Sequence, residues 1–500
     1  MWKKVLGGSL ALALTAWLLA LWGPQPTPPA WGDVWWWRNQ LILLTGVAAW
    51  ALMSLIMVLA VRPAWLEKPL DGLDKSYRLH KWAGIGAIVL GLLHYGLQLS
   101  RSLLAAWVGR PVRTPRADWW LNTFRHLAEE MGEWAVWFLA AMLVITLWQR
   151  FPYHVWRYLH KLLAVVYLVL AFHAVVLTPP AWWAQPAGVL VGLCMLVGVL
   201  CAVRSLAGAI GRSRRHAARV VSVAPQGASV LEVTCQVHPA SAWRHTAGQF
   251  AFVTFGKAEG AHPFTLLNAD QGDGTLRFAI KALGDHTGRL PLQVQPGQRV
   301  DIEGPYGCFD FRSDSAPEQV WVAAGIGATP FMAWLESLQP TPALAPRVHL
   351  HYCVRHAGEA VFAERMAALC ARLPSVTLVV HYSDDAGPVT SAALLAGTSP
   401  AASVWFCGPQ GFAEAVRQGM QQLGRSPARF HQELFQMRGG GFSAPAAYFF
   451  GCCSVGARYS RTSARARCRR LLAASRVTPR RCAISSMVSS SKSRSSSASR

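Results

Sequence analysis

Two segments of the chain read Tyr77-Arg78-Leu79-His80-Lys81 and Arg157-Tyr158-Leu159-His160-Lys161, and each opens a long apolar run. Each run carries a second histidine farther on, His94 in the first and His173 in the second, at offsets of 14 and 13 residues. At 1.5 Å per residue, each histidine pair spans roughly 20 Å of helix. Ligating side chains inside apolar runs are functional candidates, because their burial in lipid is costly.

Six apolar segments are close to the length that a bilayer-spanning helix needs. They comprise approximately residues 5–22, 41–61, 79–99, 134–149, 158–177 and 187–205. Tryptophans gather beside several of them, as amphipathic rings do at membrane interfaces. The first segment follows Lys3 and Lys4 and is also compatible with a cleaved signal peptide, although its apolar stretch is longer than usual for one.

Basic residues in short flanks predict the orientation. Lys and Arg precede the first span, separate the second from the third and the fourth from the fifth, and follow the sixth. The loop at 100–130 dissents, since it carries five arginines on the opposite side. We therefore expect a multi-pass protein of the plasma membrane (the bacterial inner membrane), with the residues after 208 in the cytosol.

The four histidines lie at two depths, because the third and fifth spans run in the same direction. His80 and His160 share one depth, and His94 and His173 share the other. Two imidazoles at one depth, from two helices, are what a bis-imidazole haem requires. An offset of 13 leaves its pair about 140° apart on a straight helix. The fifth span is therefore locally distorted, or its two haems lie on different sides. For a lone histidine the alternative is a helix-to-helix hydrogen bond.

The pattern changes after residue 215. Residues 218–312 alternate apolar and polar residues in short runs broken by Gly and Pro, which predicts a small antiparallel barrel or sandwich. From Gln319 onward, apolar strands alternate with helical segments, which implies a parallel sheet. These segments are Val320–Ala324, 330–338, Val348–Val354 and 358–372, and the pattern ends near Arg438.

Two motifs in the barrel-like region suit a flavin. His262-Pro263-Phe264-Thr265 follows a strand, so that its ring could flank an isoalloxazine and its hydroxyl could bond the polar edge; a plain turn is the alternative. Gly284 and Thr287 stand where a helix could begin and receive a pyrophosphate. We interpret Glu303-Gly304-Pro305-Tyr306-Gly307 as a tight structural turn.

Two motifs in the strand–helix region suit a nicotinamide nucleotide. Gly325-Ile326-Gly327-Ala328-Thr329-Pro330 follows a strand and opens a helix, with Thr329 as the expected cap and Pro330 in the first turn. It lacks the third glycine of the dinucleotide fingerprint. Cys407-Gly408-Pro409 ends another strand and leaves room for a nicotinamide ring, or is a plain turn. Arg355 could contact a 2′-phosphate, which favours NADPH.

The net charge of +23 owes much to residues 439–500, which are rich in Ser and Arg and contain no Asp or Glu. Without apolar periodicity this tail should be disordered. It could bind nucleic acid or anionic lipid, but we favour an incidental segment or a reading-frame artefact and expect no nucleic-acid partner. No C-x-x-C pair occurs, so a zinc or iron–sulfur site has no support.

Residues 1–438 together resemble the ferric reductase and NADPH oxidase superfamily. The two histidine pairs match its haem spacing, and the motifs at 262–265, 325–330 and 407–409 look like its flavin and nicotinamide motifs. Residues 431–438 look like the C-terminal strand of bacterial members, in which Phe435 would lie close to the flavin. The tail departs from the family pattern.

The resemblance implies a multi-domain chain. Its parts would be a six-helix transmembrane di-haem domain at 1–208, an antiparallel β-barrel FAD domain at 216–314, a parallel-sheet α/β NAD(P) domain at 317–438 and the tail at 439–500. The implied cofactors are FAD, two b-type haems and NAD(P)H, with no side chain acting as a catalytic acid or base. His80 and His160 would hold the inner haem iron, and His94 and His173 the outer one.

By the same resemblance, a hydride passes to FAD and single electrons then cross the bilayer through both haems to an external acceptor. A ferric chelate is the leading acceptor, and dioxygen, reduced to superoxide, is the alternative. A third hypothesis is a haem-free transporter or anchor with an attached flavoreductase. The sequence leaves the oligomeric state open.

Overall fold

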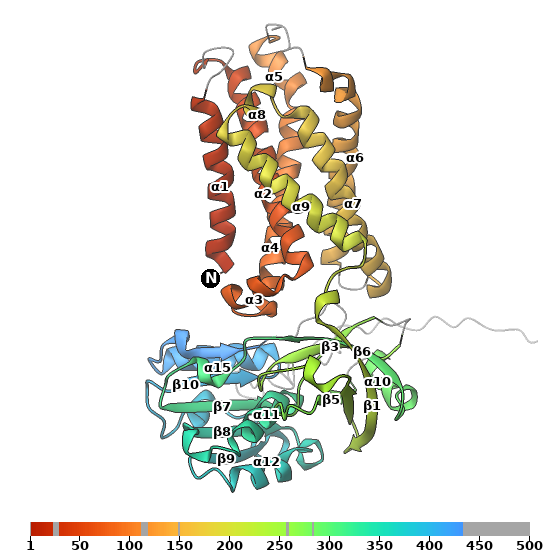
Figure 1. Cartoon of the computed structure of the whole chain (residues 1–500). Coiled ribbons are helices and arrows are strands. Elements are labelled where there is room, and N and C mark those ends of the chain that lie inside the picture. The colour runs from red at the N-terminus through yellow and green to blue at the C-terminus, as the bar shows by residue number, and fades with distance from the viewer. Residues whose placement is uncertain are drawn as a thin grey trace, which may run out of the picture. The chain divides into compact units, whose positions relative to one another are not determined.

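The computed structural model describes residues 2–23, 30–111, 119–148, 151–256, 260–282 and 285–433. In these ranges long helices come first, an antiparallel sheet follows, and a parallel sheet comes last (Figure 1). The predictions for Gly284, Phe435 and the tail at 439–500 fall outside the described residues.

Within the described ranges, six helices are long and apolar enough to cross a membrane, as the sequence predicts. They are α1 (Trp2–Trp22), α2 (Val34–Val61), α4 (Leu73–Leu99), α6 (Arg125–Leu147), α7 (Tyr153–Leu177) and α9 (Pro186–Leu206). Three short helices lie between them: α3 (Ala64–Leu70), α5 (Arg101–Val108) and α8 (Pro180–Trp183).

Some helices begin earlier than their apolar runs. Helix α6 starts at Arg125 rather than at 134, because its first turns are polar and are supported by ion pairs four residues apart. Arg125 pairs with Glu129 at 2.9 Å, and His126 contacts Glu130 at 3.5 Å. Apolar content therefore marks only the lipid-compatible part of a longer helix, and the predicted loop at 100–130 contains α5 as well as the start of α6.

Helices α2, α7 and α9 pack around two aromatic side chains. Trp50 and Tyr167 are buried and stack with their ring centroids 4.7 Å apart. The Tyr167 hydroxyl is 2.9 Å from Ser54 Oγ, so its polar end has a partner inside the bundle. Gly198 faces the Tyr167 ring so closely that an added Cβ would overlap it. These contacts fix α7, which carries two of the four histidines.

The FAD-domain prediction of an antiparallel fold is confirmed. Six strands form one sheet in the order β4-β3-β6-β1-β2-β5. They are β1 (Arg215–Gln226), β2 (Val230–Val237), β3 (Phe250–Thr254), β4 (His262–Thr265), β5 (Thr275–Lys281) and β6 (Arg299–Tyr306), with α10 (Asp285–Gln293) after β5. A bridge from Leu266 to Phe278 joins the two outer strands, so the sheet curls back on itself around a buried core.

Two motifs of this sheet lie within strands. His262–Thr265 follows β3 in the chain, as predicted, and it forms β4, paired with β3, so the alternative of a plain turn does not hold. Glu303–Tyr306 is not a turn either, because β6 continues through it and pairs Tyr306 with Phe250. The register shifts between Phe250 and Phe252, and this bulge absorbs Gly304-Pro305 without ending the strand.

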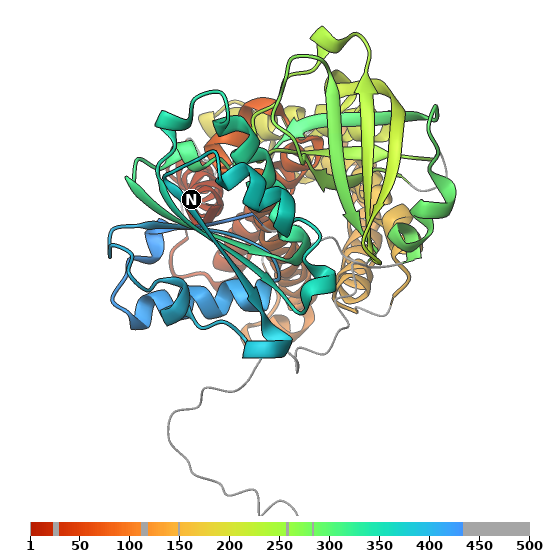
Figure 2. The same ribbon diagram turned by 90° about the horizontal axis from the view of Figure 1, so that it is seen from below.

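The parallel-sheet prediction is also confirmed. The strands are β7 (Glu318–Ala324), β8 (Arg347–Val354), β9 (Val376–Tyr382), β10 (Ser403–Cys407) and β11 (Phe430–Gln432), in the order β11-β10-β7-β8-β9. Helices α11 (Thr329–Leu338) and α12 (Ala363–Cys370) pack on one face, and α14 (Ser391–Leu394) and α15 (Gln410–Gln422) on the other (Figure 2). The helix expected at 358–372 is shorter, because residues 357–359 form a separate 3-10 turn.

The order of the parallel strands creates a switch point. The chain runs from β7 outward through β8 to β9, then returns to the other side of β7 to form β10. Loops that leave two neighbouring strands in opposite directions open a crevice at the carboxyl ends of those strands, where ligands bind in such sheets. The crevice lies at the ends of β7 and β10.

Candidate functional site

The structure brings the four membrane histidines together as two pairs. His80 of α4 and His160 of α7 have ring centroids 6.0 Å apart, and His94 and His173 on the same helices have centroids 6.4 Å apart. One metal ion held at about 2 Å by a nitrogen of each ring would separate the ring centres by roughly 6 Å. Both pairs therefore fit one iron between two imidazoles.

Helix α7 reaches both pairs without a break. It is a continuous α-helix from Tyr153 to Leu177, although its two histidines are 13 residues apart. The sequence left open whether this helix is locally distorted. The structure shows no interruption of the helix between Tyr153 and Leu177. His160 is held in place by Trp156 one turn earlier, whose ring stacks on it at 4.6 Å.

The second pair has its imidazoles oriented by backbone carbonyls. His94 Nδ1 lies 2.9 Å from the Ile42 carbonyl oxygen, and His173 Nδ1 lies 2.7 Å from the Ala128 carbonyl oxygen. A carbonyl can only accept, so Nδ1 must carry the proton and donate it. Each Nε2 is then left with the lone pair that a metal requires, which is how ligating histidines are usually fixed.

Two glycines let neighbouring helices approach these rings. A Cβ built on Gly46 of α2 would lie 3.3 Å from the His94 ring, and one built on Gly132 of α6 would overlap the His173 ring. Sequence reasoning missed both positions, because one glycine in an apolar run gives no signal of what faces it.

The two nicotinamide motifs meet at the switch point. Gly327 follows β7, Cys407 ends the adjacent parallel strand β10, and a Cβ on Gly327 would overlap the Cys407 carbonyl. A Cβ on Gly408 would in turn lie 2.5 Å from the Ala324 Cβ. Only glycines permit this approach, so the two motifs lie against each other at the switch point. Pro409 directly precedes α15 as its capping residue.

Thr329 does not cap its helix as predicted. Ala328 occupies the cap position, and the Thr329 hydroxyl donates to the Ile326 carbonyl at 2.6 Å. A tight 3-10 turn at Gly325–Ala328 displaces the start of α11 by one residue, so that Thr329 already lies in the helix. Pro330 stands in the first turn, as expected.

The structure places Arg355 beyond the end of β8, with an exposed side chain that pairs with Glu359. Glu359 also pairs with Lys281 of β5 at 3.4 Å. Hydrogen bonding from Arg355 is the main reason that the pKa of Glu359 falls to about 2. Asp384 also lies close to Arg355, so two cations and two carboxylates meet here.

The flavin candidates that the structure describes lie on β4 and α10. His262, Pro263, Phe264 and Thr265 are all half-buried. The Phe264 ring packs against Phe255 and Phe278 of the barrel, at 6.2 and 6.5 Å between centroids. Thr287 lies in the first turn of α10, where the sequence predicts a helix to begin.

Glu433 is a further candidate that the sequence did not reveal. It follows β11 and is almost fully buried, and burial raises the pKa of its carboxyl well above the usual value. Its Oε2 has no hydrogen-bond partner among the described residues, and it lies near Cys407 and Gly307. A buried, unsatisfied carboxyl at the ligand end of a parallel sheet fits a polar ligand group.

Comparison with known families assigns both halves of this arrangement. A family described as the ferric reductase like transmembrane component matches residues 45–171, and an FAD-binding domain family matches residues 215–309. The first range contains His80, His94 and His160, and the second contains β1 to β6. The chain therefore contains a ferric reductase-like transmembrane domain and an FAD-binding domain.

The ferric reductase-like chain is also similar to curated reductase subunits. It is 26% identical over 230 residues to the stachydrine N-demethylase reductase subunit of Rhizobium meliloti, which covers 43% of this chain and 65% of that protein. It is 28% identical over 179 residues to the carnitine monooxygenase reductase subunit of Escherichia coli, covering 35% and 53%. The chain thus spans about half to two-thirds of these relatives.

Among solved structures, the FAD/NAD binding domain of nitric oxide dioxygenase from Vibrio cholerae is similar at 24% identity. The match covers 44% of the ferric reductase-like chain and 98% of the other chain, with a TM-score of 0.39.

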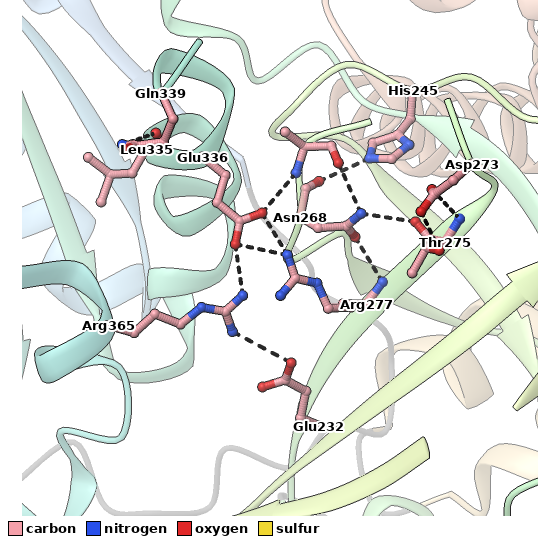
Figure 3. Close-up of polar contacts among 11 residues, drawn as sticks. Glu232, His245, Asn268, Asp273, Thr275, Arg277, Leu335, Glu336, Gln339 and Arg365 are labelled. Atoms are coloured by element: carbon pink, nitrogen blue, oxygen red, sulfur yellow. Dashed lines mark hydrogen bonds and ion pairs between the residues drawn. The ribbon is translucent and has the colours of Figure 1, made fainter. Parts of the chain in front are cut away.

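The barrel and the parallel-sheet domain of the ferric reductase-like chain are joined by a charge network around Glu336 (Figure 3). Glu336 of α11 accepts from Arg277 of β5 at 2.7 Å and from Arg365 of α12 at 2.7 Å, and Arg365 reaches Glu232 of β2 at 3.5 Å. The side chain of Glu336 is 13% exposed, and a carboxylate with two guanidinium partners fixes orientation more than it adds stability.

Gly132→Ala should disturb the second histidine pair. The new methyl group would overlap the His173 ring, so either the ring turns away or α6 moves. Loss of an orienting contact around a metal ligand typically costs 10- to 100-fold in affinity, and we expect about a tenfold weaker retention of the group bound there. The measurement is the haem content per FAD of the purified chain.

Gly96→Ala is the matched control for this change, since it also adds a methyl group to a membrane helix, two residues from His94. Nothing lies within 4 Å of its added Cβ, so its haem content should equal that of the parent. Equal haem loss in both variants would show a general effect of glycine replacement and contradict the role given to Gly132.

Proposed function

We propose that this flavin-dependent oxidoreductase of the ferric reductase-like family carries electrons from NAD(P)H across a membrane to an acceptor on the opposite side. The observation that carries the proposal is the pair of facing imidazoles at 6.0 Å and a second pair at 6.4 Å, contributed by the same two spanning helices. Two metal-binding levels along one pair of helices suit a path through an insulating bilayer.

Bound FAD would supply the change from hydride to single-electron chemistry, and two bound b-type haems would relay single electrons. The chain's own residues hold and orient these groups. His80 and His160 would hold the haem nearer the FAD domain, and His94 and His173 the other, each of the latter two aimed by a backbone carbonyl. No side chain is assigned an acid–base role.

The nucleotide sites are proposed at β4 with α10 and at the switch point of the parallel sheet. The half-buried residues of β4, from His262 to Thr265, and Thr287 of α10 would hold FAD, and Gly284 and Phe435 remain proposed from the sequence alone. Gly325, Gly327, Thr329, Pro330 and the residues 407–409 would receive the nicotinamide nucleotide at the switch point. The basic flanks of the helices support a cytosolic position for these domains.

Charges beyond the second histidine pair support a ferric chelate as the acceptor. Arg38 at the start of α2 donates to the Gln98 carbonyl in the last turn of α4 at 2.9 Å, and it lies close enough to Arg101 for the two to repel each other. Two guanidinium groups near this end favour an anionic reactant such as ferric citrate.

The acceptor test uses membranes that contain the full chain, reduced anaerobically with NADPH. Ferric citrate should reoxidise the haem bands at once and without superoxide. Faster reoxidation by dioxygen, with stoichiometric superoxide, would instead favour the oxidase alternative. Absence of any b-type haem band in purified protein would contradict the proposed function and favour a haem-free membrane anchor for a flavoreductase.

Arg355→Ala should lower the preference for NADPH over NADH. The change removes one of two cations near the proposed 2′-phosphate position, and an exposed charge-assisted contact of this kind is worth on the order of 1 to 2 kcal/mol, or about tenfold in KM for NADPH. The KM for NADH should stay unchanged. Equal NADH and NADPH turnover in the parent, unaltered by the substitution, would remove the assignment.

A further inference from the structure

Residues 62–75 form a docking segment, which runs from the end of α2 through α3 to the start of α4 and meets the FAD-binding barrel. Leu73 of this segment is buried in one cluster with Phe250, Phe252 and Tyr306 of β3 and β6. A leucine that opens a spanning helix therefore completes an apolar cluster of a separate domain. The proposed function does not depend on this contact.

Two ion pairs flank the apolar contact. Arg62 Nη2 lies 3.0 Å from Glu303 Oε1, and Arg214 Nη1 lies 2.9 Å from Glu67 Oε2. The side chains of Glu303 and Glu67 are only 6% and 11% exposed. The pairs run in opposite senses, since the docking segment supplies the cation of one and the anion of the other. Both ion pairs can form in only one placement of the docking segment against the barrel. Fixing a placement in this way is the use for which partly buried ion pairs are best suited.

Tyr306 and Gly307 complete the contact. The Tyr306 ring has the Arg214 guanidinium at 4.7 Å and the Arg62 guanidinium at 5.7 Å, and its hydroxyl donates to Glu303 at 2.9 Å. The Gly307 amide donates to Glu67 Oε1 at 2.6 Å. The segment that the sequence suggested to be a structural turn is therefore the part of the barrel that meets the docking segment.

Arg62 is held in an unusual backbone conformation. Its φ of 53° places it in the left-handed region at the end of α2, where a residue with a side chain is strained. Such strain persists only where the surroundings determine the position. The Glu303 ion pair and the Phe252 ring, 4.8 Å from the guanidinium, supply those surroundings. Nearby acidic and phenolic groups outweigh burial and raise the pKa of Arg62, so it stays charged.

We propose that these contacts form a docking latch that fixes the FAD-binding barrel against the membrane domain and so sets the rate of electron passage between them. The latch consists of Arg62, Glu67, Leu73, Arg214, Glu303, Tyr306 and Gly307. Its role in electron passage rests on the proposed function, whereas its existence does not. Breaking the Arg62–Glu303 pair of the latch leaves NAD(P)H oxidation intact, because neither residue belongs to the motifs at 262–265, 325–330 and 407–409.

The first test measures the latch without any redox reaction. Glu67→Gln removes the charge that pairs with Arg214 and weakens the acceptor of the Gly307 amide. Hydrogen–deuterium exchange of the full chain should then speed up at least about tenfold in the peptide that contains Gly307. Lys68→Gln, an equal loss of charge on an exposed neighbour in α3, should leave the exchange unchanged.

The second test compares two electron outlets of the same purified chain. Arg62→Glu and Glu303→Arg should each slow anaerobic haem reduction by NADPH at least about tenfold, while reduction of a soluble dye by the flavin stays within about twofold. The double variant restores opposite charges and should recover much of the haem rate. Glu67→Gln serves as the milder substitution if a charge reversal prevents folding.

The outcomes separate the latch from the proposed function. Unchanged exchange at Gly307 in Glu67→Gln overturns the latch itself. Faster exchange with an unchanged rate of haem reduction overturns its control of electron passage. A parental chain without haem bands contradicts the proposed function, and in that case the exchange measurement still decides whether the latch exists.

Discussion

His173→Ala should remove the group bound at the second histidine pair and stop electron passage to the external acceptor. Haem content should fall from two per chain to about one, and reduction of an external acceptor should fall at least about 100-fold, because loss of a ligand exceeds the cost of losing an orienting partner. Reduction of a soluble dye at the flavin should continue. Haem bands, FAD content and both rates are measured on the same preparation.

His126→Ala is the control for this substitution. His126 lies on α6 near the same end of the bundle, but its side chain is 85% exposed and lies 3.5 Å from Glu130. It should keep both haems and the parental rate. Two haems per chain and an undiminished outward rate in His173→Ala would rule out the imidazole pairs as the electron path.

Periodicity and motif order were enough to predict the fold of this chain. Long apolar runs locate all six helices within the described ranges, since lipid compatibility is a local property of the sequence. Alternation and strand–helix order likewise predict one antiparallel and one parallel sheet. Boundaries were harder, because polar first turns such as that of α6 depend on ion pairs rather than on apolar content.

Site features that depend on contacts between distant segments could not be predicted. Gly132 matters only because the His173 ring faces it, and Glu433 only because β11 carries it to the ends of β7 and β10. Glu303–Tyr306 contains the turn-forming residues Gly and Pro, yet it belongs to a strand, and Gly307 directly after it meets the docking segment. In each case the partner lies far away in sequence, and the composition of the segment does not identify it.

The histidine pairs were predictable in part. Spacings of 14 and 13 residues on two helices of the same direction predicted that the pairs would meet, and the distances of 6.0 and 6.4 Å agree. The orienting carbonyls of Ile42 and Ala128 were not predictable, because a backbone acceptor is the same for every residue type. The pairing of the four histidines was therefore predictable from the sequence, whereas the orientation of their rings required the structure.

Gly327→Ala should nearly abolish reduction of the flavin by NAD(P)H. The added methyl group would overlap the Cys407 carbonyl, and a backbone atom between two paired strands cannot move aside as a flexible side chain can. The loop at 325–330 must then shift away from β10 and widen the crevice between the two nicotinamide motifs. We expect at least about a 100-fold lower rate of hydride transfer, since a displacement of about 1 Å near the chemistry can have this effect.

The same substitution should leave the barrel and the membrane helices unaffected, because the crevice belongs to the parallel-sheet domain. FAD content and the haem spectrum after chemical reduction should therefore match those of the parent, and only stopped-flow reduction by NADPH should fail. Gly256→Ala, which adds a methyl group to the barrel with nothing within 4 Å, should reduce at the parental rate. If Gly327→Ala reduced the flavin at the normal rate, the nicotinamide would bind elsewhere. A ring bound beside Cys407 would be displaced when the loop at 325–330 moves.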